Sequence, residues 1–421
     1  MKKILLFVAL FSLNNVYSQH NKCNTMTNWE KAKQQDPQTE TRNAELEERI
    51  QQWISSSSTN RSAAAVITIP VVVHVIYNAN EENISEAQIN SQIAILNTDF
   101  RKMNADLLAS THAFYPVVAD AEIEFVLAKR DPNGASTTGI TRTFTDSVGF
   151  AAIDNEKFTA TGGKDNWDPT KYLNLWVANL DMTDGTLGYA AFPSDLATEP
   201  GKDGVVIDFR AFGNVGTAGT GGFGVNNAGR TAVHEVGHWL NLRHIWGDAT
   251  CGDDFVADTP PHEKDNYDCP TFPHNVGSQC NPGANGEMFM NYMDYVDDGC
   301  MNMFTAGQVT RMKAALSTAR VGITNSNGGE EVSISSVEFD NLKLDIYPNP
   351  ANGIVNIKVN SSNVESLEVK VYSITGQLIQ SENVKNANNL SIDMSNEKVG
   401  VYFATVTIDG YSIVKKIMIY E

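Results

Sequence analysis

Three histidines, at positions 234, 238 and 244, constrain the fold of this chain more than any other feature of its sequence. His234 and His238 lie four residues apart in the stretch His-Glu-Val-Gly-His, so on a helix their imidazoles share one face and can hold one metal ion. His244 follows six residues later, and a continuous helix would rotate it by about 240°, away from the pair. The three can meet only if the helix ends before His244, and Asn241 is a residue that commonly ends helices in the left-handed conformation. We therefore predict a helical segment over residues 230–242 that ends between His238 and His244.

This spacing predicts a catalytic zinc site. Zinc accepts neutral imidazole nitrogens and, in catalytic sites, keeps one coordination position open for water. Glu235 lies next to the first histidine, where a carboxylate can act as the general base that takes a proton from that water and passes it to the leaving group. The alternative is a pair of ordinary helix histidines on a solvated face, which would not require a third histidine.

The first residues indicate export from the cell. Lys2 and Lys3 precede an apolar stretch over 4–13, and small residues follow at the cleavage positions of a signal peptide. That stretch is about half of the ~20 residues that span a membrane, so we expect no integral membrane segment. The formal net charge of −19 disfavours binding to nucleic acid or anionic membranes, because phosphate contacts need Lys and Arg.

Export also decides how the cysteines are interpreted. Four of the five cysteines gather within residues 251–300, whereas Cys23 stands alone near the start. Outside the cytoplasm, four clustered cysteines predict two disulfide bonds, and their spacing leaves the three possible pairings open. A four-cysteine zinc site would need Cys-x-x-Cys pairs, which this sequence lacks.

Changes in composition divide the chain into segments. A polar N-terminal region ends in a Ser-rich stretch that indicates an exposed linker. Strands and helices then alternate, which predicts a mixed α/β domain, and short strands punctuated by turns near the C-terminus predict a small β-sandwich. The expected segments are a signal peptide (1–18), a pro-segment (19–60), a catalytic domain (61–321), a linker (322–343) and a C-terminal domain (344–421). The strands expected in the catalytic domain are 69–76, 122–128, 173–178 and 205–209, with a helix capped by Ser85.

The zinc motif, with Asn241 where a glycine is usual, resembles that of the metzincin metallopeptidases. Residues 291–295, Asn-Tyr-Met-Asp-Tyr, are similar to the metzincin Met-turn, which implies that Met293 forms an apolar floor under the metal and that Tyr295 helps to stabilise the tetrahedral intermediate. Over about residues 67–321 the finer resemblance is to the pappalysin family, in particular its ulilysin-like members. It implies an α+β catalytic domain with an active-site helix, and a zinc-dependent endopeptidase that acts on proteins or peptides. We expect the protein to be a monomer.

The same resemblance implies two disulfides and a calcium site. It pairs Cys251 with Cys280 and Cys269 with Cys300. Calcium is expected near these cysteines, and the candidate ligands are Asp254, Asp258 and Thr259. The alternative for these three residues is a plain acidic loop with turn residues.

Substrate preference and latency are further implications. Ulilysin-like enzymes select a basic residue after the scissile bond through an aspartate that follows the Met-turn tyrosine, and Asp298 occupies the matching position. The alternative is a solvated loop acid or a calcium neighbour. Such an enzyme could cut its own chain between Asn60 and Arg61, and until then the Cys23 thiolate could occupy the open position of the zinc ion. The alternatives for Cys23 are an unpaired cysteine and a lipid attachment site.

The last segment resembles the C-terminal sorting domain of type IX secretion substrates. The matching features are Tyr-Pro-Asn-Pro at 347–350, Gly376, Gly-Val-Tyr at 400–402 and the closing Lys-Lys-Ile at 415–417. The resemblance implies secretion machinery as a partner and passage across a bacterial outer membrane. A generic β-sandwich that binds carbohydrate or protein is the alternative. For the whole chain, the rival to a peptidase is a zinc-binding surface adhesin, which would not require Glu235.

Overall fold

The structure is a computed structural model that describes residues 22–57, 66–180, 185–331, 344–360, 364–408 and 411–420. The chain divides into two units, Met1–Val332 and Ser333–Glu421. The predicted signal peptide and the predicted cleavage site at Asn60 and Arg61 lie outside the described residues. We call residues 22–57 the N-terminal segment.

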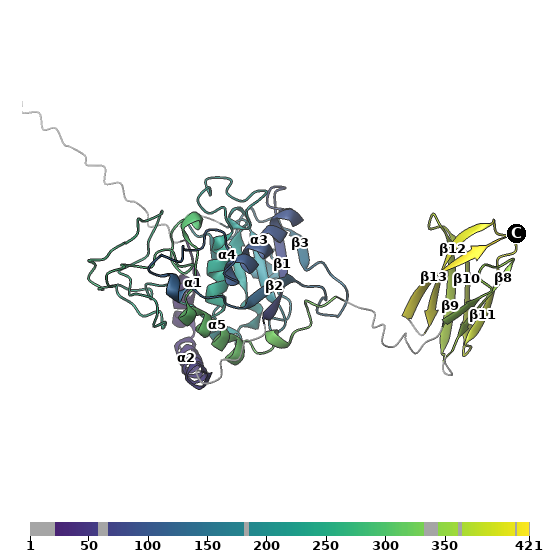
Figure 1. The fold of residues 1–421 in the computed structure, drawn as a ribbon, viewed down its shortest axis with the longest axis horizontal. Coiled ribbons are helices and arrows are strands. Elements are labelled where there is room, and N and C mark those ends of the chain that lie inside the picture. The colour runs from purple at the N-terminus through teal and green to yellow at the C-terminus, as the bar shows by residue number, and fades with distance from the viewer. Residues whose placement is uncertain are drawn as a thin grey trace, which may run out of the picture. The chain divides into compact units, whose positions relative to one another are not determined.

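A mixed β-sheet organises the first unit (Figure 1). Its strand order is β2–β1–β4–β6–β5, and β3 pairs with the second half of β1. All pairs are parallel except that of β5 with β6. Because a parallel sheet is covered on both faces, β1 is a continuous apolar run, with Val71 and Val73 buried on one side and Val72 and Ile76 on the other. The strands are β1 Ile67–Tyr77, β2 Ile123–Leu127, β3 Ile140–Phe144, β4 Leu173–Ala178, β5 Gly188–Ala190 and β6 Val205–Asp208.

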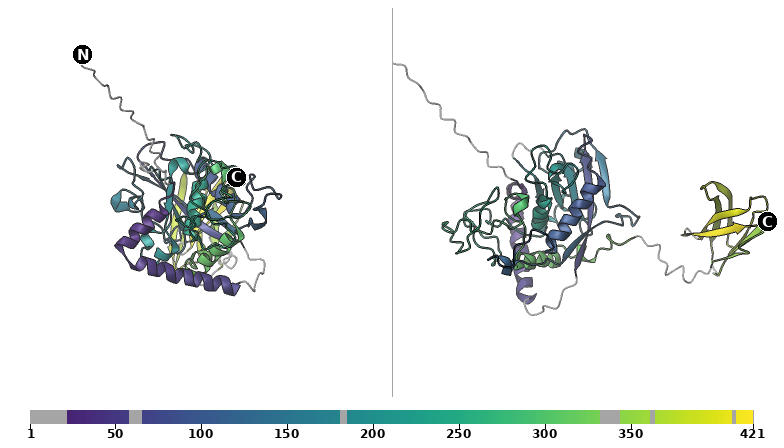
Figure 2. Two further views of the ribbon diagram at one scale, coloured as in Figure 1. Left: turned by 90° about the vertical axis from the view of Figure 1, so that its left-hand side faces the viewer. Right: turned by 45° about the horizontal axis from the view of Figure 1, so that its top comes forward.

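Two helices pack side by side on one face of this sheet (Figures 1 and 2). Helix α3, Glu86–Phe100, begins after Ser85, whose side chain accepts a hydrogen bond from the backbone N–H of Gln88, as the sequence predicts. Helix α4, Arg230–Trp239, contacts α3, β5 and β6. The side chains that these helices bury in the common core include Ile89, Ile93, Leu96, Val233 and Val236.

The N-terminal segment forms two helices that pack on this unit. They are α1, Thr25–Gln35, and α2, Gln38–Ser57. α2 packs against α5, Ala306–Thr318 (Figure 1). Leu46 and Ile50 of α2 are buried against Ala314 and Ala315 of α5.

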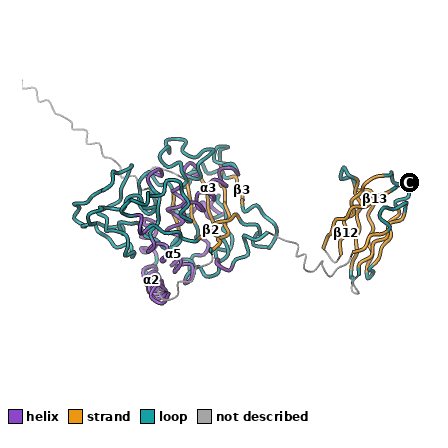
Figure 3. The backbone as a smooth tube through the Cα atoms, viewed as in Figure 1, coloured by secondary structure: helices purple, strands orange, loops and turns teal. Residues whose placement is uncertain are grey.

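The chain between α4 and α5 is almost wholly loop (Figure 3). It contains one short 3-10 helix, η8, Asp298–Cys300. Two disulfides, Cys251–Cys280 and Cys269–Cys300, tie this loop together. They are the two pairings that the resemblance implies.

The second unit is an all-β sandwich. One antiparallel sheet has the order β10–β9–β12–β13 and the other β11–β8–β7. Val355 of β8, Val369 of β9 and Val406 of β12 meet in one buried core. The predicted fold classes, α+β for the catalytic unit and all-β for the C-terminal unit, are confirmed. The strands are β7 Leu344–Tyr347, β8 Ile354–Val359, β9 Ser366–Ser373, β10 Leu378–Lys385, β11 Asn389–Asp393, β12 Gly400–Ile408 and β13 Tyr411–Ile419.

Candidate active site

The three histidines of the motif meet in the first unit. The Nε2 atom of His238 lies 3.1 Å from that of His234 and 3.1 Å from that of His244. All three side chains are buried. Together with the sulfur of Cys23 they form a group whose potential ligand atoms all lie within 4.8 Å of one another.

The other ring nitrogens are held by hydrogen bonds that select one tautomer. Nδ1 of His234 faces the carbonyl oxygen of Tyr292 at 2.7 Å, and Nδ1 of His238 faces that of Leu242 at 2.8 Å. Because a carbonyl only accepts, each Nδ1 carries the proton and each Nε2 presents a lone pair. His244 Nδ1 similarly contacts a carboxylate oxygen of Asp248.

The donor set fits a metal ion. Burial and then the neighbouring His244 lower the pKa of His234 to about 3, and burial lowers the pKa of His238 as well, so both rings are neutral. Neutral Nε2 lone pairs that face one another at 3.1 Å repel unless a cation lies between them. Three imidazole nitrogens are a typical ligand set of catalytic zinc.

Helix α4 ends where the motif requires it. The last helical residue is Trp239, three residues earlier than the predicted segment, and Asn241 has a φ of 70°. The backbone N–H of Leu242 returns to the carbonyl oxygen of Gly237 at 2.9 Å. The prediction that a left-handed Asn241 ends the helix before His244 is confirmed.

Met293 lies directly against the active-site helix. Its side chain is fully buried. A Cβ atom on Gly237 would lie 2.5 Å from the Met293 sulfur, so the glycine within the motif is required for this close approach. The backbone also joins the two segments, since the N–H of Ile245 donates to the carbonyl oxygen of Met293 at 3.1 Å. Met293 is therefore packed against the helix that carries His234 and His238.

Glu235 points toward the N-terminal segment. Its Oε2 atom accepts hydrogen bonds from the Cys23 thiol at 3.4 Å and the Thr25 hydroxyl at 3.0 Å. Its Oε1 atom is buried without a hydrogen-bond partner among the described residues, which is the side that a water molecule can occupy. Burial raises the pKa of Glu235 to about 8, although the bonds from Cys23 and Thr25 oppose this.

The chain around Cys23 lies against strand β5. The N–H of Leu187 donates to the carbonyl oxygen of Lys22 at 2.8 Å, and the N–H of Asn24 donates to that of Gly188 at 3.1 Å. This pairing is parallel and brings the Cys23 sulfur to the histidines. Burial and then the Glu235 carboxylate raise the pKa of the Cys23 thiol.

The hydroxyl group of Tyr295 lies beside the third histidine. Its hydroxyl lies 3.1 Å from Nε2 of His244 and 3.2 Å from the carbonyl oxygen of Cys23, to which it donates. Burial raises the pKa of this phenol above its ordinary value, so it is a neutral hydrogen-bond donor. Tyr295 is thus placed to donate to an oxygen next to the histidines.

The side chain of Asp298 contacts the backbone where α4 begins. Its Oδ2 atom accepts hydrogen bonds from the backbone N–H groups of Ala228 at 2.8 Å and Arg230 at 3.2 Å. The Arg230 guanidinium also donates to the Asp298 carbonyl oxygen at 2.6 Å. Asp298 is 2% exposed, and burial raises the pKa of its carboxyl group. The solvated-loop alternative for Asp298 is therefore wrong.

The calcium candidates do not gather into one ligand group. Asp254 accepts hydrogen bonds from the Thr259 hydroxyl at 2.9 and 3.0 Å. Asp258 instead contacts the beginning of α5, where it accepts from the Thr305 hydroxyl at 2.6 Å and the Gly307 N–H at 2.8 Å. Within the described part of the chain, the only group of three or more potential ligand side chains is that of Cys23 and the histidines.

Several residues of the site were not predicted. Lys22 and Thr25 flank the cysteine, Asp297 precedes the predicted pocket aspartate, and Asp248 supports the third histidine. Asp248 could have been found, because metal-binding imidazoles commonly donate their other N–H to a carboxylate and Asp248 lies four residues after His244. Lys22 and Thr25 carry no such local signal.

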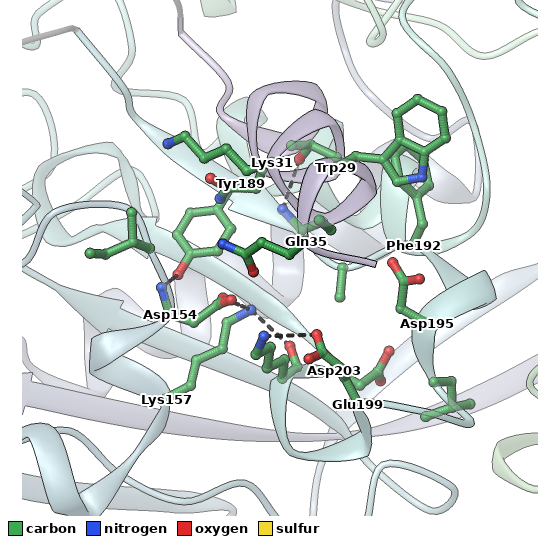
Figure 4. A pocket seen from close by; sticks show the side chains of 18 residues that line it. Trp29, Lys31, Gln35, Asp154, Lys157, Tyr189, Phe192, Asp195, Glu199 and Asp203 are labelled. Carbon is green, nitrogen blue, oxygen red and sulfur yellow. Dashed lines mark hydrogen bonds and ion pairs between the residues drawn. The ribbon is translucent and has the colours of Figure 1, made fainter. Parts of the chain in front are cut away.

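A pocket of about 350 Å³ lies beside α1 (Figure 4). Trp29, Lys31 and Gln35 of α1 line one side, and Tyr189 and Asp195 belong to the opposite wall. None of the three histidines nor Glu235 lines it. It is a gap along the docked α1 and not the reaction centre.

A mixed α/β unit with three converging histidines, a buried glutamate and a buried methionine against the active-site helix defines a metallopeptidase of the metzincin class. Comparison with known proteins agrees. Residues 159–317 match the model of a family described as pregnancy-associated plasma protein-A, and residues 345–420 match the secretion system C-terminal sorting domain.

Individual proteins and solved structures that are similar to this chain are metallopeptidases as well. The chain is 31% identical over 272 residues to an extracellular metalloprotease of Verticillium alfalfae, which covers 62% of this chain and 80% of that protein. Among solved structures, it is similar to a promirolysin mutant of Tannerella forsythia, with 45% identity, a TM-score of 0.64 and coverage of 72% of this chain and 97% of that one. It is also similar to mature mirolysin of Tannerella forsythia in complex with a cleaved peptide, with 49% identity, a TM-score of 0.59 and coverage of 62% and 96%.

The chain belongs to the pregnancy-associated plasma protein-A family of metallopeptidases. It is a secreted metalloendopeptidase with a C-terminal sorting domain. The family implies zinc, which the histidine group fits. None of the helices in the described residues combines the length and apolar character needed to cross a membrane.

Proposed function

We propose that this protein is made as a zymogen and, once activated, hydrolyses peptide bonds that have Lys or Arg after the scissile bond. The observation that carries the proposal is the position of the Cys23 sulfur among the three histidines, in hydrogen-bond contact with Glu235. We propose the segments 1–18 as signal peptide, 19–60 as pro-segment, 61–321 as catalytic domain, 322–343 as linker and 344–421 as sorting domain.

Each group at the centre has a chemical role in this proposal. A zinc ion held by His234, His238 and His244 would polarise the scissile carbonyl and lower the pKa of a water molecule. Glu235 takes a proton from the attacking water and passes it to the leaving amine. The Tyr295 phenol donates a hydrogen bond to the oxygen on which negative charge develops. Met293 and Asp248 hold the histidines in place.

Latency in this proposal arises from direct occupation of the centre. Cys23 offers a sulfur ligand to the metal, as a cysteine thiolate can. Thr25 occupies the hydrogen-bonding position of Glu235, since its hydroxyl donates to Oε2 at 3.0 Å. With both groups in place, the sulfur takes the position that a substrate carbonyl would need, and Oε2 of the general base is already hydrogen-bonded. The similarity to promirolysin supports the zymogen reading.

The preference for basic residues is supported by the charge of the neighbouring pocket. A small cavity next to Glu235 is lined by Asp298 and by Lys22 of the pro-segment. A buried carboxylate at such a place favours Lys or Arg and rejects apolar side chains. Cleavage between Asn60 and Arg61 would follow the same rule and would make activation autocatalytic.

Cleavage-site mass spectrometry on a proteome-derived peptide mixture tests the activity and the preference together. We expect the activated enzyme to cut before Lys and Arg, and the Glu235→Ala variant to leave the mixture intact. Glu235-dependent cuts before other residues would keep the peptidase and remove the preference. An activated, zinc-loaded enzyme that does not cut would favour the alternative of a zinc-binding surface adhesin. N-terminal sequencing of the processed chain tests whether it begins at Arg61.

Calcium is a separate part of the proposal. Asp254 is buried, and burial raises the pKa of its carboxyl group to about 6, so a cation beside it would offset the cost of a buried negative charge. We expect added calcium to raise the melting temperature of the wild-type chain and to have a smaller effect on Asp254→Asn. Equal effects on both chains would exclude Asp254 as a ligand.

A further inference from the structure

Arg243, the residue before the third histidine, is a buried cation that contacts two aromatic rings. It is 8% exposed. The central carbon of its guanidinium lies 4.7 Å from the centre of the Phe192 ring and 4.9 Å from the centre of the Trp29 ring. A cation over a ring face is attracted by the π electrons, most strongly where water is excluded. Phe192 lies in the proposed catalytic domain, whereas Trp29 belongs to α1 and leaves with the pro-segment.

Hydrogen bonds satisfy this guanidinium only in part. Its Nε atom is buried without a hydrogen-bond partner among the residues that the structure describes. Its Nη1 atom faces the sulfur of Met26, a weak acceptor, at 3.3 Å. Burial lowers the pKa of Arg243, although an arginine side chain stays charged in proteins. The aromatic rings therefore stabilise a buried charge that hydrogen bonds serve poorly.

The Phe192 ring lies toward the end of β5 that is farther from Asp298. Leu187, just before β5, lines the same small cavity as Asp298. Ala190, the last residue of β5, donates its N–H to the side chain of the first residue of α1 at 2.8 Å. Phe192 follows two residues later, and the centre of its ring lies 5.7 Å from that of His238. A substrate that directs the residue after its scissile bond toward Asp298 therefore has its preceding residues beside Phe192.

The contacts of α1 indicate the chemistry that this place accepts. Trp29 and Glu30 are neighbours on α1, and both lie near Arg243. The charge of Glu30 is close enough to act on the pKa of Arg243, but its carboxylate accepts a hydrogen bond from Lys33 at 3.3 Å. The group that lies against the guanidinium is the Trp29 ring. An aromatic side chain therefore fits this site better than a carboxylate does.

We propose that Arg243 and Phe192 form a second substrate subsite, which takes an aromatic side chain from the residues before the scissile bond. In the uncut chain Trp29 covers this subsite, and its departure leaves the guanidinium with one ring instead of two. An aromatic side chain of the substrate restores the missing contact. Because the contact is made by bound substrate as well as in the transition state, it acts mainly on KM. This subsite rests on the proposed peptidase function and adds a selecting contact before the scissile bond.

Cleavage of paired peptides by the activated enzyme tests this subsite. The peptides share Lys after the scissile bond and carry Trp or Leu at one position before it. We expect the wild type to favour Trp at one such position through a lower KM. Arg243→Met should lower this Trp-over-Leu ratio of kcat/KM by about fivefold to thirtyfold, as the loss of a cation–π contact implies. Lys202→Met is the matched control, because Lys202 lines the pocket beside α1 but takes no part in the contact with Trp29.

Peptide binding without catalysis separates recognition from a structural role. In the Glu235→Ala enzyme freed of its pro-segment, fluorescence anisotropy gives the dissociation constants of labelled Trp and Leu peptides. We expect the Trp peptide to bind more tightly when Arg243 is present and the two peptides to bind alike in Arg243→Met. Arg243→Gln, which also removes the charge, should give the same result if the Met variant does not fold. The melting temperature and zinc content of each variant check that the centre is intact. Equal weakening of both peptides would assign Arg243 a structural role and overturn the subsite.

The outcomes separate this subsite from the proposed function. A wild-type enzyme that cuts before Lys and Arg without favouring Trp would overturn the subsite and leave the proposed function intact. A preference for Glu over Trp at these positions would also overturn it, because the guanidinium would then bind a carboxylate. An enzyme without Glu235-dependent cutting would remove the proposed function and the subsite with it.

Discussion

The two ends of the N-terminal segment bind the catalytic part in different ways. Its first residues, 22–25, which we call the anchor, bury a cation, a thiol and a hydroxyl against Asp297, the histidines and Glu235. Helix α2 instead buries Leu46 and Ile50 against α5. Both carboxylate oxygens of Glu47, which is partly exposed, also accept hydrogen bonds from the Arg311 guanidinium, at 2.8 and 2.5 Å.

The anchor therefore blocks the active site, whereas helix α2 holds the N-terminal segment in place. The anchor contacts the groups that would carry out the reaction, so a change of a few atoms there alters access to the centre. Helix α2 contributes apolar area, which stabilises docking without touching the centre. Arg311 links α2 to the residues that follow α4, since it binds Glu47 and its Nε donates to the Asn241 carbonyl oxygen. We expect substitutions in the anchor to alter latency and those in α2 to alter the stability of docking.

The largest effect on the activity of the precursor is expected from Cys23→Ala. Without the sulfur, the full-length precursor should cleave a fluorogenic peptide about 100-fold faster than the wild-type precursor, which corresponds to a loss of ~2.8 kcal/mol. The assay uses uncut precursor, verified by intact mass before and after the measurement. A variant that stays as silent as the wild type would show that the cysteine does not enforce latency.

Leu46→Ala tests the holding role of α2. The leucine is 1% exposed, so its truncation should weaken docking of α2 by about 2 to 5 kcal/mol. Limited proteolysis of the precursor should then cut α2 faster, while peptide cleavage rises much less than in Cys23→Ala. Gln52→Ala, at an exposed position on the same helix, is the control. If Leu46→Ala released as much activity as Cys23→Ala, the anchor and helix α2 would not have separate roles.

Thr25→Val tests the hydrogen bond between the anchor and Glu235. Valine keeps the shape but removes the hydroxyl that donates to Glu235 and accepts from the Ala190 N–H at 2.8 Å. The loss of these buried bonds should cost about 1 to 3 kcal/mol and raise precursor activity less than Cys23→Ala does. Thr25→Ser keeps the hydroxyl and should remain latent. Equal activity of the Val and Ser variants would exclude a role for this hydroxyl.

The smallest effect is expected from lowering the pH, which weakens the docking of α2. Burial alone would raise the pKa of Glu47, but the hydrogen bonds and charge of Arg311 outweigh it and hold the pKa below the usual 4.5. The unfolded segment therefore binds a proton first, so this contribution is present above pH 4.5 and is lost as the pH falls through the lower value of the docked state. The contribution of a partly exposed pair is at most about 1 kcal/mol. Below about pH 4.5, hydrogen exchange should show weaker protection of α2 in the wild type. In Glu47→Gln the protection of α2 should no longer depend on pH in this range.

Local spacing determined the histidine group, because it depends on residues within one turn and its end. His234 and His238 share a helix face, and the left-handed Asn241 ends that helix, for reasons that operate over fewer than a dozen residues. The strand at residues 173–178 was predicted with the bounds that β4 has, since a short buried apolar run bounded by polar residues carries its own signal. Strand β5 was not predicted, because its three residues are too few to show a period.

The tertiary structure alone decided which distant residues reach the centre. Cys23 and Glu235 are 212 positions apart, and no local pattern places Lys22 or Thr25 beside them. Their positions follow from the pairing of the anchor with β5, a strand edge that exists only once the sheet has formed. The same holds for Asp298, whose carboxylate binds N–H groups some seventy positions earlier in the chain. Sequence spacing therefore determined the chemistry of the metal site, and long-range packing decided what covers it, because hydrogen bonds between distant segments form only after their backbones have been brought together.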